Sequence, residues 1–341
     1  MKSKKLLTLL GCIGFALILA VLPLMAACAQ PAPAPAPAPE PIVLKAISTP
    51  RPDNALADGF HLYVDTINER SKGELVIDYM GGPDIIPTKE QGMAVKEGVV
   101  DMGALYGSIV LAGGVKSFDM VVMAREMPDV LRKRGLYDLL QKDLNEFGLY
   151  LIGQWTVTFQ NVWIFTDKHV DRPQELAGQR FVTYPAVMPW LEAMGCTAIV
   201  MSPAERYSAI ERGVADGVAV GVSSALNYHF YEVCDYFIDQ GALGGSHWIT
   251  MNLDKWNSLP KHLQDLLVNT ERELIPQFRQ IMVDGEARNR QQLIDFGMQP
   301  ITFSPADNEW FINKAYEGSW EKFYEKYPEL GPKMFEFLKK G

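Results

Sequence analysis

The chain has 341 residues, of which 48% are hydrophobic and 21% charged, a composition typical of a globular protein. A chain of this length usually splits into two domains. Its net charge of −9 argues against nucleic acid and against an anionic membrane surface as partners.

The N-terminus has the pattern of a targeting signal. Three lysines within the first five residues precede an apolar run that ends near Leu24, which predicts a signal peptide over residues 1–27. The stretch MAAC, 25–28, resembles a bacterial lipoprotein cleavage box, so Cys28 is predicted to become the lipidated first residue. A single N-terminal membrane helix is the alternative, since the apolar run is nearly long enough to span a bilayer.

A tract of alternating proline and alanine, PAPAPAPAPEP, follows at residues 31–41. Such a sequence favours polyproline II, a semi-rigid spacer without a core. Residues 28–41 are therefore predicted to be a lipid anchor and a linker, which hold a globular body away from a membrane surface.

The globular body opens with alternating strands and helices. Five elements are expected in order: strand 42–49, helix 54–72, strand 74–80, helix 88–98 and strand 99–105. The first helix can end at Gly73 in a left-handed cap. Thr88, three residues before Gln91, fits a capping box at the start of the second helix.

The same order returns later in the chain. The expected elements are strand 178–184, helix 188–195, strand 196–201, helix 203–213 and strand 214–220. Ser202 and Glu205 fit a second capping box, with Pro203 at the first helical position. The two copies share G-V-V-D at 98–101 and G-V-A-D at 213–216. Two such units predict two α/β domains, each with a mostly parallel sheet, and a cleft between them.

From residue 261 to residue 297 the sequence is mostly helical. Pro276 is expected to kink or divide this helix. A helix of this length can run across both domains as a brace.

Catalytic and metal-binding signatures are scarce. Neither a Walker loop nor a GxGxxG motif is present, and the nearest match to a nucleophile elbow, residues 221–225, lacks its second glycine. Cys196 and Cys234 have no zinc-like spacing; a disulfide and two buried free thiols both remain open, and the free thiols are favoured. The five histidines are scattered and are interpreted as structural. We therefore expect no enzyme activity, no cofactor and no metal.

Aromatic residues are the richer signal. They gather around the segments that should join or line the two domains, namely Trp155, Phe159, Trp163, Tyr184, Trp190 and Trp248. For each of them alone, filling a core is the favoured interpretation. Together they favour an aromatic-lined cleft, because binding pockets are mostly apolar with a few placed polar groups.

The body resembles the substrate-binding proteins of TRAP (tripartite ATP-independent periplasmic) transporters, of the C4-dicarboxylate-binding type. The stretches that carry the resemblance are 71–103, 173–185, 194–218, 230–237 and 256–267. The resemblance implies a two-domain periplasmic-binding-protein-like α/β fold, a long bracing helix, hinge closure over a small ligand and membrane-embedded transporter subunits as partners. We assign residues 42–157 plus 248–285 to domain I and residues 158–247 plus 286–341 to domain II.

The motif expected to bind a carboxylate is altered in this chain. Relatives usually read G-x-K-x-R in the strand after the linker, and the arginine pairs with the substrate carboxylate. Here Arg180 takes the lysine position and Val182 takes the arginine position. Arg180 lies two residues back along the strand and is interpreted as a strand-start residue. Two further ligand positions of the family carry Pro203 and Val220, and an additional arginine of some relatives falls near Phe159 or Gln160.

Without a cationic partner, a buried carboxylate would suffer a desolvation cost of several kcal/mol. The favoured hypothesis is therefore a neutral, aromatic or cationic ligand that contacts the aromatic residues. Hydrogen bonds to this ligand are expected from Tyr106, Gln160, Tyr184 and Asn227. The alternative is an organic acid bound by a relocated arginine, with Arg51 and Arg125 as the candidates.

The sequence thus predicts a monomeric, lipid-anchored, extracytoplasmic solute-binding protein that delivers a small molecule to TRAP membrane subunits. Its membrane contact is expected to be through the anchor alone. A rival hypothesis is a ligand sensor that presents its closed form to a membrane receptor.

Overall fold

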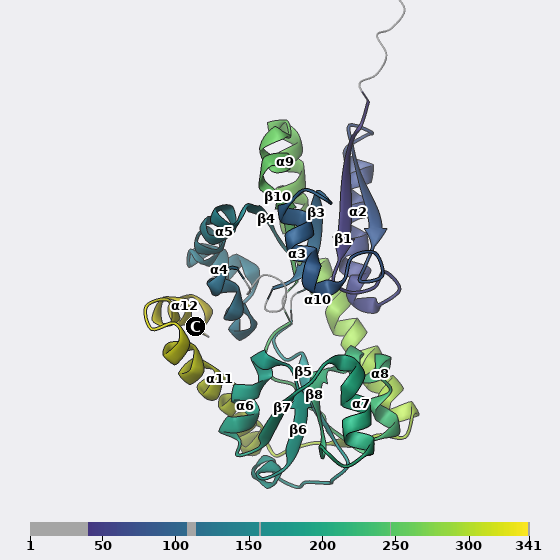
Figure 1. Ribbon diagram of the computed structural model, residues 1–341, viewed down its shortest axis with the longest axis vertical. Coiled ribbons are helices and arrows are strands. Elements are labelled where there is room, and N and C mark those ends of the chain that lie inside the picture. The colour runs from purple at the N-terminus through teal and green to yellow at the C-terminus, as the bar shows by residue number, and fades with distance from the viewer. Residues whose placement is uncertain (1–39, 108–113, 157, 246, 340–341) are drawn as a thin grey trace, which may run out of the picture. The chain divides into compact units, whose positions relative to one another are not determined.

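The structure of the protein is a computed structural model that describes residues 40–107, 114–156, 158–245 and 247–339, without the side chains of residues 203 and 204 (Figure 1). The signal peptide, Cys28 and almost all of the Pro-Ala linker lie outside the described residues. The predictions made for them stay predictions.

The first sheet, called sheet I below, has five strands in the order β2-β1-β3-β10-β4. They are β1 (Ile42–Ser48), β2 (Leu75–Gly81), β3 (Met102–Tyr106), β4 (Leu149–Gln154) and β10 (His247–Asn252). β1 pairs in parallel with both β2 and β3, as the alternation of strands and helices predicted. β10 enters from far along the chain and pairs antiparallel with β3 and β4.

The second sheet, sheet II, has six strands in the order β11-β9-β5-β8-β6-β7. They are β5 (Val162–Thr166), β6 (Arg180–Thr183), β7 (Thr197–Val200), β8 (Gly217–Gly221), β9 (Tyr236–Ile238) and β11 (Gln299–Ile301). β6 is parallel to β7 and β8, whereas β5 is antiparallel to β8 and β9. The predicted α/β class with two sheets is confirmed.

Helices connect and cover the strands of both sheets. Those before β10 are α2 (Asp58–Arg70), α3 (Thr88–Lys96), α4 (Pro128–Lys133), α5 (Leu136–Phe147), α6 (Met188–Ala193), α7 (Pro203–Glu211) and α8 (Val222–Asn227). Those after it are α9 (Leu253–Ser258), α10 (Lys261–Asp295), α11 (Pro305–Lys326) and α12 (Leu330–Leu338). Short 3-10 turns include η2 (Ala55–Ala57) and η5 (Val121–Met123).

Only one of the two predicted capping boxes forms. Before α7, the backbone N–H of Ser202 and its hydroxyl both donate to the carboxylate of Glu205, at 3.1 and 2.6 Å. The box predicted at Thr88 is wrong, because α3 starts at Thr88 itself after Pro87 and has no side-chain cap. Gln91, its expected partner, is buried and donates to the carbonyl of Ser48 at 2.9 Å, so it joins α3 to β1 instead.

The long helix α10 runs unbroken for 35 residues with Pro276 inside it, so the proline does not divide the helix (Figure 1). α10 packs on α2 and β4 of sheet I and on α8 beside sheet II. The predicted bracing helix is confirmed.

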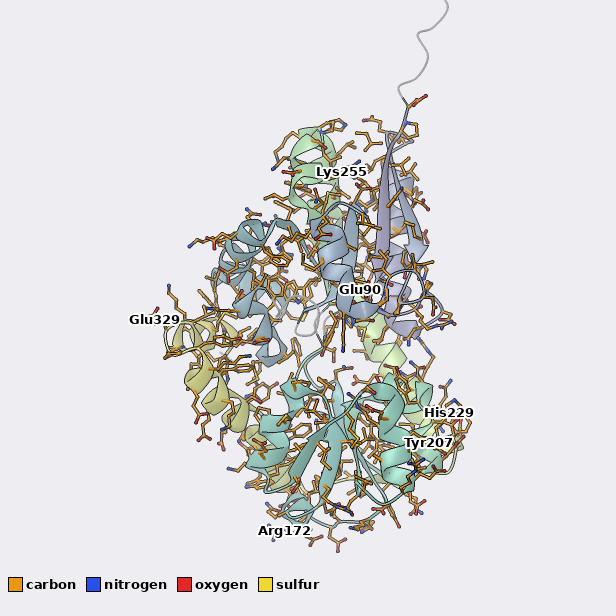
Figure 2. The ribbon with its side chains drawn as sticks, in the orientation of Figure 1. Glu90, Arg172, Tyr207, His229, Lys255 and Glu329 are labelled. Atoms are coloured by element: carbon orange, nitrogen blue, oxygen red, sulfur yellow. The ribbon has the colours of Figure 1, made fainter. Side chains whose placement is uncertain are left out.

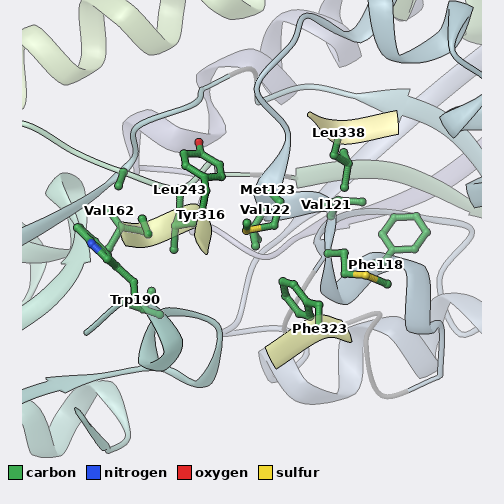
Figure 3. Close-up of a cluster of buried hydrophobic side chains, with 14 of the residues drawn as sticks. Phe118, Val121, Val122, Met123, Val162, Trp190, Leu243, Tyr316, Phe323 and Leu338 are labelled. Carbon is green, nitrogen blue, oxygen red and sulfur yellow. The ribbon is translucent and has the colours of Figure 1, made fainter. Parts of the chain in front are cut away.

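The core is made of three clusters of buried apolar side chains. The first includes side chains from both sheets together with η5, α11 and α12, and Figure 3 shows Trp190, Val122, Tyr316 and Leu338 within it. The second cluster lies between sheet I and the helices α2 and α10. The third lies between sheet II and the helices α7 and α8. Cys196 and Cys234 are buried and free, as favoured from the sequence.

Candidate functional site

A cleft of about 750 Å³ is lined by residues from sheet I, from sheet II and from the loops and helices next to them. From sheet I it takes the loop that follows β1, the end of β3 at Tyr106 and the start of β10 at His247. From sheet II it takes Tyr184 after β6, the end of β8 and α8. Most of these segments follow the carboxyl ends of parallel strands, where ligands bind in open α/β sheets.

Arg206, in the first turns of α7, is a buried cation in the lining of the cleft. Its Nε donates to the carbonyl of Met201 at 3.1 Å and its Nη2 donates to the carbonyl of Thr183 at 3.2 Å. Thr183 ends β6 and Met201 directly follows β7, so the guanidinium lies at the carboxyl edge of sheet II. Burial lowers the pKa of Arg206, while the neighbouring Tyr184 and Tyr228 counteract this shift. Among the described residues, no carboxylate forms an ion pair with it.

Tyr184, Tyr106 and His247 form a polar, uncharged group beside Arg206. Burial raises the pKa of Tyr184 well above its usual value, and the nearby Tyr106 adds to this shift. Burial lowers the pKa of His247 to about 3, so its imidazole is neutral at physiological pH. The ring of His247 packs 4.9 Å from that of Tyr106, and its Nδ1 lies 3.3 Å from the hydroxyl of Thr156. These groups can donate and accept hydrogen bonds without changing the charge of the cleft.

Small neutral groups of the lining come from β8, α8 and the segment before β5. Ser223, Ser224 and Asn227 come from α8, and Asn161 precedes β5. Val220 supplies an apolar contact at the end of β8. Amide and hydroxyl groups of this kind suit a polar small molecule.

Arg51 lies at the exposed rim of the cleft and already has partners. Its Nε lies 3.2 Å from Asp53, and its Nη1 lies 3.2 Å from Asp84. The hydrogen bond and charge of Asp53, followed by the charge of Asp84, raise the pKa of Arg51. Of the two arginines that the sequence offered as relocated cations, Arg51 is therefore in the cleft but neutralised.

The other candidate cation, Arg125, lies elsewhere. Together with Phe159 and Gln160 it lines a separate hollow of about 270 Å³ beside α10 and α11. The guanidinium of Arg125 stacks 4.3 Å from the ring centre of Tyr316. Three sequence-predicted positions thus come together, but away from the main cleft.

Four of the predicted ligand positions are in the core. Trp155 packs on Phe60, Trp190 on Phe311, and Trp248 on both Phe118 and Tyr137. Val182 is fully buried beneath α7. Five further predicted ligand positions line the main cleft, namely Arg51, Tyr106, Tyr184, Val220 and Asn227. Pro203 begins α7, and its side chain lies outside the description.

Arg180 begins β6 and does not line the cleft. Its Nε and Nη2 donate to the carboxylate of Asp216 at 3.0 and 3.1 Å, and Lys168 adds a third bond at 2.8 Å. The bond from Arg180 is the largest influence that holds the pKa of Asp216 far below its usual value. Arg180 is thus a strand-start residue that joins β6 to the loop before β8.

Sequence reasoning missed Arg206 and His247. An arginine on a helix usually belongs to a solvated face, and His247 was interpreted as structural like the other histidines. His229, whose position Figure 2 labels, is exposed and does not line the cleft. One signal for Arg206 was its place in the first turns of a capped helix that follows a strand, since such turns face the carboxyl edge of a sheet.

Within the described ranges, no three His, Cys, Asp or Glu side chains gather in a way that would hold a metal ion. Among the described helices, none has both the length and the apolar character that crossing a membrane requires.

Comparison with known proteins identifies the family. The sequence model of bacterial extracellular solute-binding protein family 7 matches residues 48–327. A protein of Haemophilus influenzae is 20% identical over 250 residues, which are 73% of this chain and 75% of that protein.

Solved structures share the fold. An extracytoplasmic solute receptor of Bordetella pertussis that binds pyroglutamic acid matches with TM-score 0.72 and 18% identity, over 87% of this chain and 99% of that one. A TRAP periplasmic solute-binding protein of Desulfovibrio salexigens with bound orotic acid matches with TM-score 0.73 and 18% identity, over 87% of this chain and 97% of that one. A third, from Pseudomonas aeruginosa with bound L-malate, matches with TM-score 0.70 and 18% identity, over 83% of this chain and 100% of that one. The chain belongs to bacterial extracellular solute-binding protein family 7, and its predicted resemblance to TRAP solute-binding proteins is confirmed.

Proposed function

We propose that the protein captures a small organic acid in the cleft, that Arg206 binds the carboxylate of this acid, and that the protein delivers it to TRAP membrane subunits. The single observation that carries the proposal is the buried guanidinium of Arg206, which has no ion-pairing carboxylate among the described residues. A buried cation is costly unless it is paired, and a bound carboxylate would supply the pair.

The position of Arg206 supports this role. Its Nη2 donates to the carbonyl of Thr183. The preceding residue, Val182, is the one that the family resemblance predicts to stand in place of a carboxylate-binding arginine. Helix α7 packs against β6, and the side chain of Arg206 reaches from this helix to the last carbonyl of the strand. The positive charge is thus provided by the helix and not by the strand.

The known ligands of the structural neighbours favour the same conclusion. Pyroglutamate, orotate and malate all carry at least one carboxylate. The hypothesis of a neutral ligand was based on the absence of a cation from the site, and Arg206 removes that premise. The organic acid, which the sequence left as the alternative, is the better supported ligand class.

Further features of the proposal come from the sequence. A lipid anchor at Cys28 and the linker up to residue 41 would tether a monomeric binding protein to the outer surface of a membrane. The assignment of residues 42–157 plus 248–285 and of 158–247 plus 286–341 to two domains belongs to the same proposal. Closure of these domains on the ligand would present a surface to the membrane subunits.

The test is a binding survey with the purified body, residues 42–341. Pyroglutamate, orotate and malate are titrated by calorimetry beside their neutral amides, and a wider panel of organic acids and amines is surveyed by thermal shift. We expect at least one acid to raise the melting temperature and its amide to fail, because only the acid pairs with Arg206. Stabilisation by amines or neutral aromatic compounds, without any by acids, would contradict the proposal.

A further inference from the structure

The two arginines of the cleft differ in their surroundings, and this difference bears on the number of charges that a ligand can carry. We propose that the ligand has one carboxylate and a neutral polar far end, and that Asp53 and Asp84 impose this choice by occupying Arg51. The inference rests on the proposed function, because it assumes that Arg206 holds a carboxylate.

Arg51 already pairs with two carboxylates. Nε is directed at Oδ1 of Asp53 and Nη1 at Asp84, both at 3.2 Å, so two edges of the guanidinium are taken. Asp53 lines the cleft beside Arg51. A second ligand carboxylate that approached Arg51 would therefore also approach the carboxylate of Asp53, and like charges repel.

The charge balance of the lining leads to the same conclusion. Its formally charged members are Arg51, Asp53 and Arg206, while His247 is neutral. Asp53 and the neighbouring Asp84 pair with Arg51, so among the described residues Arg206 is the charged member of the lining that lacks a carboxylate partner, and one ligand carboxylate would pair with it. A dicarboxylate would leave one negative charge uncompensated, and its desolvation inside a cleft is unfavourable.

The rest of the lining suits a neutral polar group. Asn161, Ser223 and Asn227 line the cleft with amide and hydroxyl groups, and His247 contributes a neutral imidazole. An amide, lactam or hydroxyl at the far end of the ligand can exchange hydrogen bonds with them. The inferred class is a small monocarboxylate with such a group.

Matched pairs of acids test this inference by calorimetry on residues 42–341. In each pair one carboxylate is replaced by a carboxamide of the same size: succinate and succinamate, glutarate and glutaramate, malate and malamate. In the wild-type protein we expect the monoamide to bind at least about tenfold more tightly than its dicarboxylate.

The double variant Asp53→Asn/Asp84→Asn should free Arg51 from its two ion pairs, and asparagine has nearly the same size as the aspartate that it replaces. We expect its affinity for the dicarboxylates to rise by about tenfold or more, and its affinity for the monoamides to change by less than about threefold. Asp65→Asn/Asp78→Asn is the control, because it makes the same change in net charge at exposed positions outside the cleft lining. The control should leave both affinities unchanged.

The outcomes separate the inference from the proposed function. Dicarboxylates that bind the wild type as tightly as their monoamides would overturn the inference and leave the organic-acid function standing. An unchanged preference in Asp53→Asn/Asp84→Asn would overturn the role given to these aspartates. If no member of any pair binds while amines do, the proposed function fails, and the inference fails with it.

Discussion

Replacing Arg206 by glutamine is expected to weaken the binding of the organic acid by about 2–4 kcal/mol, roughly 30- to 1,000-fold. The loss is large because the carboxylate would be buried beside Tyr184 and the neutral His247 without a compensating charge. Arg206→Lys should give an intermediate affinity, since it keeps the charge but loses the planar fork. Calorimetric titration of each variant with the best acid from the survey measures the effect.

Arg206→Gln also loses the bonds from Arg206 to the carbonyls of Met201 and Thr183, so the melting temperature of this variant must be measured as well. Arg180→Gln is the matched control: it makes the same substitution in the neighbouring strand, at a residue that pairs with Asp216 outside the cleft. We expect this control to bind the acid as the wild type does. Equal affinities for a folded Arg206→Gln variant and the wild type would show that the carboxylate lies elsewhere.

The fold was predictable because it depends on patterns that are local in the sequence. Alternating strands and helices such as 42–49, 54–72 and 74–80 correspond to β1, α2 and β2, whose apolar residues recur at the periods of strands and helices. The insertion of β10 between β3 and β4 was not visible in this way, because its neighbours are far away in the chain. An antiparallel pairing between strands that are distant in the sequence has no local signature.

The site was harder to predict, because side-chain type does not indicate which way a side chain points. Trp155, Trp190 and Trp248 suggested a cleft lining, yet each is almost fully buried among other apolar groups. Large aromatic side chains contribute apolar area to cores and to pockets alike. Arg206 shows the converse: a charged helical residue typical of a surface is buried here, because α7 starts at the carboxyl edge of sheet II.

Arg132→Met is expected to destabilise the fold by about 3–5 kcal/mol, because it removes the partner of a buried carboxylate. Glu271 of α10 is fully buried and accepts from Nη2 of Arg132 at 2.7 and 3.0 Å. It also accepts from the backbone N–H of Gln154 at 2.8 Å, which joins α10 to β4. The packing is close, since a Cβ at Gly153 would lie 2.0 Å from the carboxyl carbon of Glu271. Urea unfolding of residues 42–341 measures the loss.

The loss of stability caused by Arg132→Met should depend on pH. Burial raises the pKa of Glu271 to about 7, even with Arg132 beside it, whereas the unfolded chain has a value of about 4.3. Between these values the unfolded state binds fewer protons than the folded state, so the contribution of Glu271 to stability is full below about pH 4 and is lost as the pH rises toward 7. Without Arg132 the folded pKa rises further and this loss extends to higher pH.

The effect of Arg132→Met on the free energy of unfolding should therefore be greater at about pH 8 than at about pH 5. Arg70→Met is the control, because it removes the partner of the exposed Glu273 on the same helix and should cost less than about 1 kcal/mol at both values. Arg132→Met/Glu271→Leu should recover only part of the stability, because the N–H of Gln154 loses its acceptor. A pH-independent effect of Arg132→Met would mean that its contact with the ring of Tyr137, 3.8 Å from the ring centre, matters more than its charge.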